Sequence, residues 1–205
     1  MVQPAKYIQP TRGTMHNYTL IAYPDEQTSQ KIRFEKELFA DTYLSQGDTI
    51  AKPGITIASF LAFEAMEDTL LRYLHRIIKN QRSFEILLNN FSGFPLHSVY
   101  FRVQNPEVIQ SLGKELKVIQ DYLLSCSCPP LKRVNKPHLC LAAGLPEPIY
   151  FKAMSDYSRK SFHESFMVEQ LVLVRKNNGY EPSKPINIFP LHCAECLPGQ
   201  HFYQK

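Results

Sequence analysis

The sequence predicts an α+β protein with two similar lobes around a central cleft, and three observations support this. The chain of 205 residues is 44% hydrophobic and 20% charged, which is typical of a globular protein with a substantial core. Strand-like and helix-like segments alternate along it. A seven-residue pattern occurs twice, which indicates a duplicated unit.

The first strand is predicted over residues 17–23, because this run is rich in β-forming side chains and ends at Pro24. Asp25 is a suitable N-cap for the helix that follows. The apolar residues of that helix recur at helical spacing and are Ile32, Phe34, Leu38, Phe39 and Tyr43. We expect Gly47 and Asp48 to end this region, before a buried strand over 55–63.

The middle of the chain predicts two helices around a hairpin. A helix over about 66–80 has one apolar stripe, formed by Leu70, Leu71, Leu74, Ile77 and Ile78. Strands over 84–91 and 99–103 are joined through the turn-rich residues 92–95. A long helix begins near Pro106, and its inner face carries Val108, Ile109, Leu112, Leu116, Ile119 and Leu123.

The last third begins with an irregular segment, because adjacent prolines after Cys128 cannot continue a helix. The elements expected beyond it are a strand over 138–143, a helix over 147–159, a long strand over 166–175 and a short strand over 186–189. The tail, 178–205, is expected to be largely irregular because of its prolines.

The internal repeat lies at the entrance to two of these strands. Residues 52–58 (KPGITIA) match 136–142 (KPHLCLA), and Ser-Phe pairs at 83–84 and 161–162 follow the helix in each copy. Two equivalent strand–helix–strand units, about 50–104 and 134–177, imply two lobes related by a pseudo-twofold axis within one domain, 1–205.

Side chains in a strand alternate between its two faces, so the polar positions of each copy share a face. Gly54 and Thr56 lie together in the first copy, and His138 and Cys140 lie together in the second. A polar pair on a mostly apolar strand is costly unless it meets water or a ligand. Both pairs are therefore expected to line the cleft.

This pattern resembles the 2H phosphoesterase superfamily, which includes the 2′-5′ RNA ligase-like proteins and cyclic phosphodiesterases and whose hallmark is two H-x-T/S motifs. The resemblance covers residues 17–177 in the order and spacing of the elements. It implies two lobes, each an antiparallel sheet with flanking helices. It also implies action on, or binding of, a nucleotide or RNA-end 2′,3′-cyclic phosphate, without a cofactor.

The chain departs from the family pattern at two positions. Gly54 stands where the first histidine is expected, and Cys140 stands where the second hydroxyl is expected. The resemblance implies a catalytic role for His138 and Thr56, and phosphate contacts from Thr56 and Cys140. With one of two acid–base groups absent, the reaction is expected to be lost or slow, since each group contributes roughly 10²–10⁴-fold.

Other residues are candidates for the cleft. His16 and His97 are potential substitutes for the missing histidine, although a lone histidine is more often structural. Lys52 and Lys136 precede the two motif strands and could attract phosphate, or could belong to simple strand-entry turns.

Side chains of the hairpin and of a nearby loop are further candidates. Tyr100 and Arg102 on the hairpin are candidates for base stacking or cleft contacts, with packing in the sheet as the alternative. Lys132 and Arg133 form a small basic patch, which is most simply a solvated loop.

The five cysteines lack a disulfide pattern and are expected to be free thiols. Zinc binding by Cys126, Cys128, Cys193 and Cys196 beside His192 is the alternative, but only their spacing favours it, so no metal is expected. A nucleophilic Cys140 activated by His138 is a second minor alternative.

The net charge of +4 permits an anionic ligand without requiring one. The longest apolar stretch, 55–63, is far shorter than the ~20 residues that span a bilayer, and no signal sequence is visible, so a cytoplasmic protein without membrane contact is expected. Three hypotheses follow: a divergent phosphoesterase, a catalytically inactive nucleotide- or RNA-binding module, and a structural partner-binding protein. The sequence does not indicate the oligomeric state.

Overall fold

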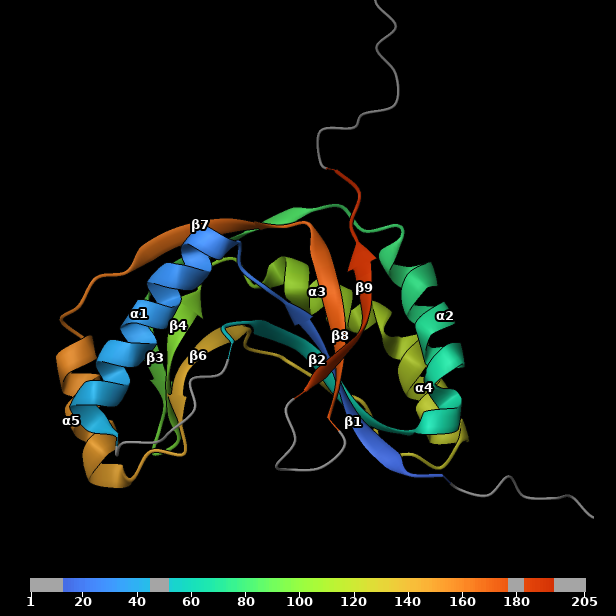
Figure 1. Cartoon of the computed structure of the whole chain (residues 1–205), viewed down its shortest axis with the longest axis horizontal. Coiled ribbons are helices and arrows are strands. Elements are labelled where there is room, and N and C mark those ends of the chain that lie inside the picture. Colours follow the sequence, from blue (N-terminus) through green and yellow to red (C-terminus); the bar gives the residue numbers. More distant parts are fainter. Residues whose placement is uncertain (1–12, 45–51, 177–182, 194–205) are drawn as a thin grey trace, which may run out of the picture.

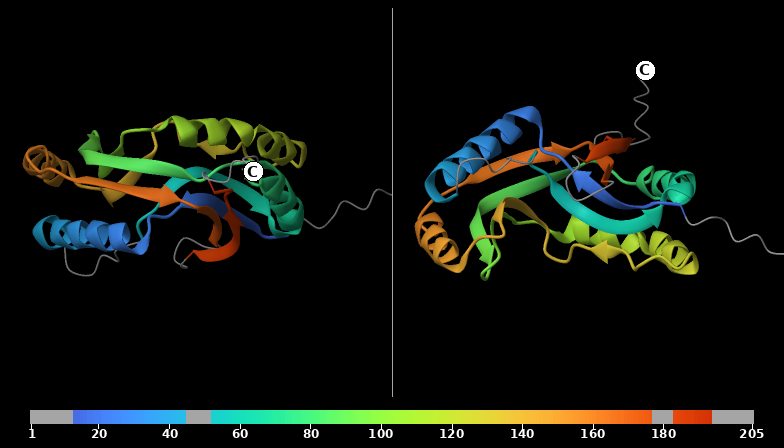
Figure 2. Two further views of the ribbon diagram at one scale, coloured as in Figure 1. Left: turned by 90° about the horizontal axis from the view of Figure 1, so that it is seen from above. Right: turned by 60° about the horizontal axis from the view of Figure 1, so that its bottom comes forward.

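The computed structural model describes residues 13–44, 52–176 and 183–193, which form one nine-stranded sheet with helices against it (Figures 1 and 2). The strands are β1 (Met15–Ala22), β2 (Ile55–Phe63), β3 (Phe84–Phe94), β4 (Ser98–Val103), β5 (Lys132–Arg133), β6 (His138–Ala143), β7 (His163–Val168), β8 (Gln170–Lys176) and β9 (Lys184–Pro190). The helices are α1 (Glu26–Tyr43), a 3₁₀ turn (Glu64–Met66), α2 (Glu67–Ile78), α3 (Glu107–Glu115), α4 (Lys117–Ser125) and α5 (Glu147–Tyr157).

The sheet has two halves that meet at its centre. Its order is β7-β3-β4-β6-β2-β1-β8-β9, with β5 paired to β2, and these neighbours are all antiparallel. We call β7, β3, β4 and β6 the β6 half, and β2, β1, β8, β9 and β5 the β2 half. Figure 1 shows α1 and α5 with the β6 half and α2 and α4 with the β2 half. The α+β class and the two-lobed architecture predicted from sequence are confirmed.

The two halves are not the two sequence repeats. The first repeat contributes β2 to one half but β3 and β4 to the other, while the second repeat contributes β6 and β7 to one half and β8 to the other. In the second repeat, the predicted long strand over 166–175 is two strands separated at Glu169. One part, β7, pairs with β3, and the other part, β8, pairs with β1.

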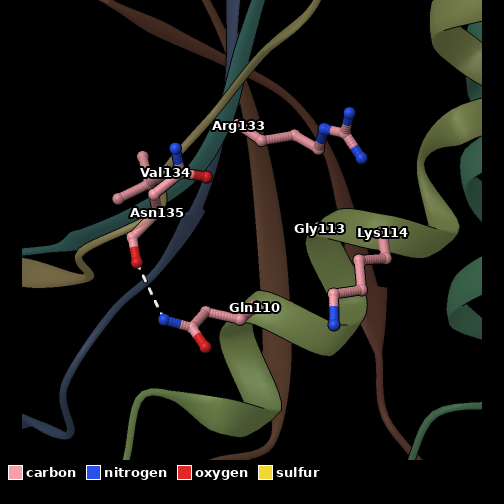
Figure 3. Close-up of a pocket in the computed structure, with 6 residues that line it drawn as sticks. All are labelled: Gln110, Gly113, Lys114, Arg133, Val134 and Asn135. Atoms are coloured by element: carbon pink, nitrogen blue, oxygen red, sulfur yellow. Dashed lines mark hydrogen bonds between the residues drawn. The ribbon is translucent and has the colours of Figure 1, made fainter.

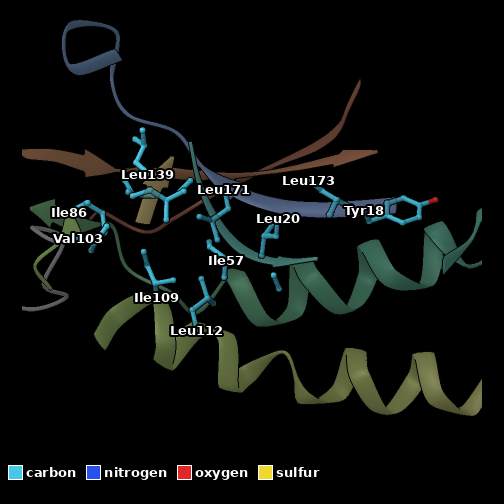
Figure 4. Close-up of a cluster of buried hydrophobic side chains, with 14 of the residues drawn as sticks. Tyr18, Leu20, Ile57, Ile86, Val103, Ile109, Leu112, Leu139, Leu171 and Leu173 are labelled. Carbon is cyan, nitrogen blue, oxygen red and sulfur yellow. The ribbon is translucent and has the colours of Figure 1, made fainter. Parts of the chain in front are cut away.

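The hydrophobic core of the β2 half lies between its sheet and α3 (Figure 4). Ile109 and Leu112 of α3 are buried there against Ile57, Leu20 and Leu171. Removing one such aliphatic side chain from water contributes about 1.5–3 kcal/mol. The β6 half has an aromatic core in which rings from helices and strands are in contact: Phe39, Phe91, Phe101, Tyr157 and Phe162.

Helix α1 begins as the sequence predicts. The Asp25 carboxylate accepts hydrogen bonds from the backbone N–H of Thr28 at 2.8 Å and from its hydroxyl at 3.0 Å. The first of these bonds holds the pKa of Asp25 below its usual value, because it stabilises the charged form. The predicted apolar stripe is wrong for Phe34 and Leu38, which are 64% and 39% exposed, because their positions turn away from those of Ile32 and Phe39.

Two further predictions are corrected. The single helix predicted after Pro106 is two helices, α3 and α4, because Leu116 has a ψ of 7° and interrupts the helical geometry; Val108 is exposed rather than on the inner face. The connector predicted at 92–95 is largely strand, since β3 continues to Phe94 and the turn follows, with Leu96 at a φ of 55°.

The remaining elements agree with or extend the predictions. Strand β9 is longer than expected, and β5 was not predicted. The predicted break at Gly47–Asp48 and the ends of the predicted tail lie outside the described residues. Within the described ranges, no helix is long and apolar enough to cross a membrane.

Candidate functional site

The two sequence motifs meet at the centre of the sheet. Strands β2 and β6 pair there through Ile55 and Leu139, the middle residues of the two motif triplets, and both side chains are fully buried. Paired residues point to the same side of a sheet, and their neighbours along each strand point to the other side. Gly54, Thr56, His138 and Cys140 therefore share one face, which we call the motif face.

Strand β4 adds two predicted residues to this face. Its register places Arg102 opposite His138 and Tyr100 opposite Cys140. The Tyr100 and His138 rings have centroids 4.8 Å apart, and the ring centroid of Phe94 of β3 lies within 5.0 Å of both. His138 is therefore held between aromatic side chains, with a cationic side chain on the neighbouring strand.

The His138 ring is oriented by a hydrogen bond to the backbone. Its Nδ1 lies 2.8 Å from the carbonyl oxygen of Lys136. A carbonyl oxygen only accepts, so Nδ1 carries the proton and donates it, and in the neutral ring Nε2 has a lone pair. A histidine in this tautomer can accept a proton or a hydrogen bond at Nε2.

The Gly54 side of the motif face is already filled. A side chain at residue 54 would begin 2.7 Å from Cγ2 of Ile21 and 2.9 Å from Cε1 of Tyr23. The Lys52 ammonium lies over the same tyrosine ring, 4.2 Å from its centroid. The sequence predicts that Gly54 lines the cleft, and the structure shows that neighbouring side chains occupy the space beside it.

Cys140 is half-buried beside His138, and its environment favours the neutral thiol. Burial raises the pKa of the Cys140 thiol, and the positive charge of Lys36 on α1 opposes this only in part. A thiolate is the reactive form of cysteine. The geometry therefore favours a packing or weak hydrogen-bonding role over the nucleophilic alternative.

Neither substitute histidine lies near Gly54. His16 is buried and pairs with Ala62, at the far end of the β1–β2 ladder from Ile55. At ~3.3 Å per residue this separation is on the order of 20 Å. His97 lies in the exposed β3–β4 turn, where its backbone N–H bonds to Phe94 and its carbonyl accepts from Leu145.

The basic candidates divide between the two faces of the sheet. Lys52 and Lys136 are exposed beside their motifs. Lys132 pairs with Ser59 and Arg133 with Ala58, so these two neighbours point to opposite sides. Ala58 is in the buried core with α3, and Arg133 lies on that side, whereas Lys132 lies on the side of the motif face.

The described cysteines of the alternative zinc site differ in exposure. Cys128 is buried and its Sγ lies 3.6 Å from Sδ of Met66, Cys126 is half-buried and Cys193 is exposed. Cys196 lies outside the described residues. Across the part of the chain that is described, no group of three or more His, Cys, Asp or Glu side chains could hold a metal.

Two cavities lined by described residues lie away from the motif face. One of about 500 Å³ is bounded by α3 and the loop after β5, and Figure 3 shows its lining residues: Gln110, Gly113, Lys114, Arg133, Val134 and Asn135. The other, of about 320 Å³, lies between α2 and the α3–α4 region. Neither is lined by a predicted catalytic residue, so the central cleft stays a prediction. The convergent polar groups make the motif face the better candidate site.

Sequence reasoning missed two contributors to the motif face and one charge that acts on Cys140. The sequence indicates Tyr23 only as the end of a strand and Phe94 only as part of a turn, and it assigns no role to Lys36. Their proximity to the motifs arises from β1, β3 and α1, which are distant in sequence. A single sequence contains no periodic signal for such contacts.

Comparisons with known structures identify the fold. A crystal structure of E. coli LigT complexed with 3′-AMP superposes with a TM-score of 0.63 at 15% identity, covering 86% of this chain and 98% of that one. TT0787 of Thermus thermophilus gives 0.63 at 15% identity, covering 87% and 99%. A crystal structure titled only as a phosphoesterase gives 0.59 at 15% identity, covering 86% and 98%.

These matches show that the chain has the two-lobed fold of LigT and of the matched phosphoesterase, which is the fold that the sequence resemblance implies. No family model matches the chain. No curated protein matches it in sequence. The likeness therefore concerns the fold, and the functional residues must be argued from this chain itself.

Proposed function

We propose that the chain binds the phosphate of a nucleotide or an RNA end on the motif face, with Thr56 and His138 as the central contacts. The observation that carries the proposal is the pairing of Ile55 with Leu139. It brings the polar residues of two sequence-distant motifs onto one face at the centre of the sheet.

The chemistry of the surrounding residues suits a phosphorylated ligand. The Thr56 hydroxyl can donate to a phosphate oxygen, and the exposed Lys52, Lys136 and Arg102 add positive charge. Tyr100 offers a ring for stacking on a base. LigT, which shares the fold, has been crystallised with 3′-AMP, with ATP and with NADP+, which supports a nucleotide as the ligand class.

A second candidate is slow hydrolysis of a 2′,3′-cyclic phosphate, favoured by the protonated Nδ1 of His138. In that state the neutral ring can act as a base through Nε2. The two-histidine mechanism lacks its other group, since residue 54 is glycine and its side-chain space is occupied. We therefore rank binding above turnover.

Calorimetric titration with 3′-AMP, and with adenosine as the ligand lacking phosphate, tests the proposal. We expect 3′-AMP to bind at least about tenfold more tightly than adenosine, because charge-assisted hydrogen bonds to phosphate supply ~1.5–3 kcal/mol each. His138→Ala should weaken 3′-AMP binding by a similar factor. His97→Ala, a change in the exposed hairpin turn, is the matched control and should bind normally.

Equal affinity for 3′-AMP and adenosine would contradict phosphate recognition. An unchanged affinity for 3′-AMP in a folded His138→Ala variant would show that the nucleotide does not bind at His138, and would contradict the motif face as its binding site. Turnover of 2′,3′-cyclic AMP above the His138→Ala background would establish the second candidate in place of simple binding.

A further inference from the structure

We propose that Tyr23 takes over the role of the missing side chain at residue 54, by donating a hydrogen bond from its phenol hydroxyl to the ligand phosphate. This inference rests on the proposed function, because it assigns a further contact in the same site. The position of the tyrosine ring carries it: its edge atoms lie within 3.0 Å of the point where a residue-54 side chain would begin.

The register of β1 places Tyr23 on the correct side of the sheet. Ala22 pairs with Ile55 and shares the buried core face, so the next residue points to the motif face. Ile21 pairs with Thr56 and lies on that same face. Tyr23 therefore lies beside Gly54 on the motif face, just beyond the end of β1. It is on the β2 half of the site, whereas His138 is on the β6 half.

The Tyr23 hydroxyl has no hydrogen-bond partner among the described residues, so its donor is not committed to another of them. Burial of the ring raises the pKa of Tyr23, so the phenol keeps its proton at neutral pH. A neutral phenol beside a phosphate is a donor, whereas a phenolate would repel it.

Lys52 completes this arrangement. Its ammonium lies 4.2 Å from the centroid of the Tyr23 ring, and such a contact holds a ring in place while it brings a positive charge to it. Lys52 and Tyr23 thus form a pair of hydrogen-bond donors beside Gly54. Glycine at 54 is required by this packing, since any larger residue would displace the ring.

Tyr23→Phe is the sharpest test, because it removes the hydroxyl and keeps the ring, its packing and its contact with Lys52. We expect this variant to bind 3′-AMP about tenfold more weakly, the loss of one charge-assisted hydrogen bond, with adenosine binding unchanged. Tyr73→Phe is the matched control, since Tyr73 is half-buried on α2 against Tyr122 and should bind 3′-AMP normally.

A second variant separates the hydroxyl from the charge. Lys52→Gln should weaken 3′-AMP binding and reduce its dependence on salt, because one cation near the phosphate is lost. Circular dichroism and thermal unfolding of each variant establish that it is folded. Inorganic phosphate, titrated in parallel, shows whether the effect belongs to the phosphate or to the nucleoside.

The outcomes distinguish this inference from the function on which it rests. If the wild type binds 3′-AMP, His138→Ala loses binding and Tyr23→Phe does not, the role of Tyr23 is overturned and the proposed function stands. If Tyr23→Phe and Tyr73→Phe lose affinity equally, the effect is not specific and the inference is also overturned. If the wild type shows no preference for phosphate, both fail together.

Discussion

The two halves of the motif face carry different side chains at equivalent motif positions, Gly54 and His138. On the β6 half, His138 is present, its tautomer is fixed by the Lys136 carbonyl, and aromatic rings flank it. On the β2 half, Gly54 has no side chain, and Ile21 and Tyr23 fill the volume. The strand next to each motif, and not the motif alone, decides which groups reach the site.

The buried side of the same strands is nearly symmetric. Ile55 and Leu139 pair directly, and both are fully buried. The equivalent apolar residues of the two motifs thus form the joint between the halves, while the polar positions beside them differ. A core position is held by packing on every side, whereas a side chain on the motif face has fewer packing constraints and can differ more between the two copies.

The largest effect is expected at this joint. Leu139→Ala and Ile55→Ala should each lower the free energy of unfolding by about 2–5 kcal/mol, because each leaves a cavity in a packed core. Urea unfolding followed by circular dichroism measures this. A loss below about 1 kcal/mol for one change alone would mean that the halves do not depend equally on the central pair.

The next effect concerns the filled position on the β2 half. Gly54→His should destabilise the protein by about 1–3 kcal/mol, because the new side chain must displace Ile21 and Tyr23. Gly54→His should destabilise the Tyr23→Ser variant less than it destabilises the wild type. In a double-mutant cycle we expect a coupling free energy between the two changes of roughly 0.5 kcal/mol or more. Ala143→His, at an exposed position of β6, is the control.

Strictly additive costs for Gly54→His and Tyr23→Ser would show that the two residues do not share space. That result would weaken the contrast between the halves, because the first half would then be open rather than refilled.

A smaller effect is expected in the reactivity of Cys140. At pH 8 iodoacetamide should modify Cys140 at least about tenfold more slowly than the exposed Cys193, because burial and a raised pKa keep the thiol protonated and shielded. Mass spectrometry of digested protein measures both rates, and denatured protein should show similar rates at the two sites. Faster modification at Cys140 would revive the nucleophilic alternative.

The smallest effect is expected from restoring a hydroxyl on the β6 half. Cys140→Thr should tighten 3′-AMP binding by about two- to fivefold, because a hydroxyl is a better donor to phosphate oxygen than a thiol. Calorimetry measures the change, and Cys193→Thr is the control. A weaker affinity would mean that the thiol packs more usefully than a hydroxyl at this half-buried position.

The sequence by itself determined the elements and the equivalence of the two motifs. Period-two alternation in KPGITIA and KPHLCLA assigned Ile55 and Leu139 to the core, and an aspartate before an amphipathic run assigned the start of α1. These are local rules, in which the spacing of a few residues fixes which side is buried.

Only the tertiary structure decided what surrounds the motifs. The exchange of strands between the halves, the occupation of the Gly54 position by Tyr23 and the contact of Phe94 with His138 all join residues that are distant in the chain. Their proximity depends on which strand pairs with which and in what register. The pattern of a single strand does not contain its partner, so the composition of the site follows from sheet assembly.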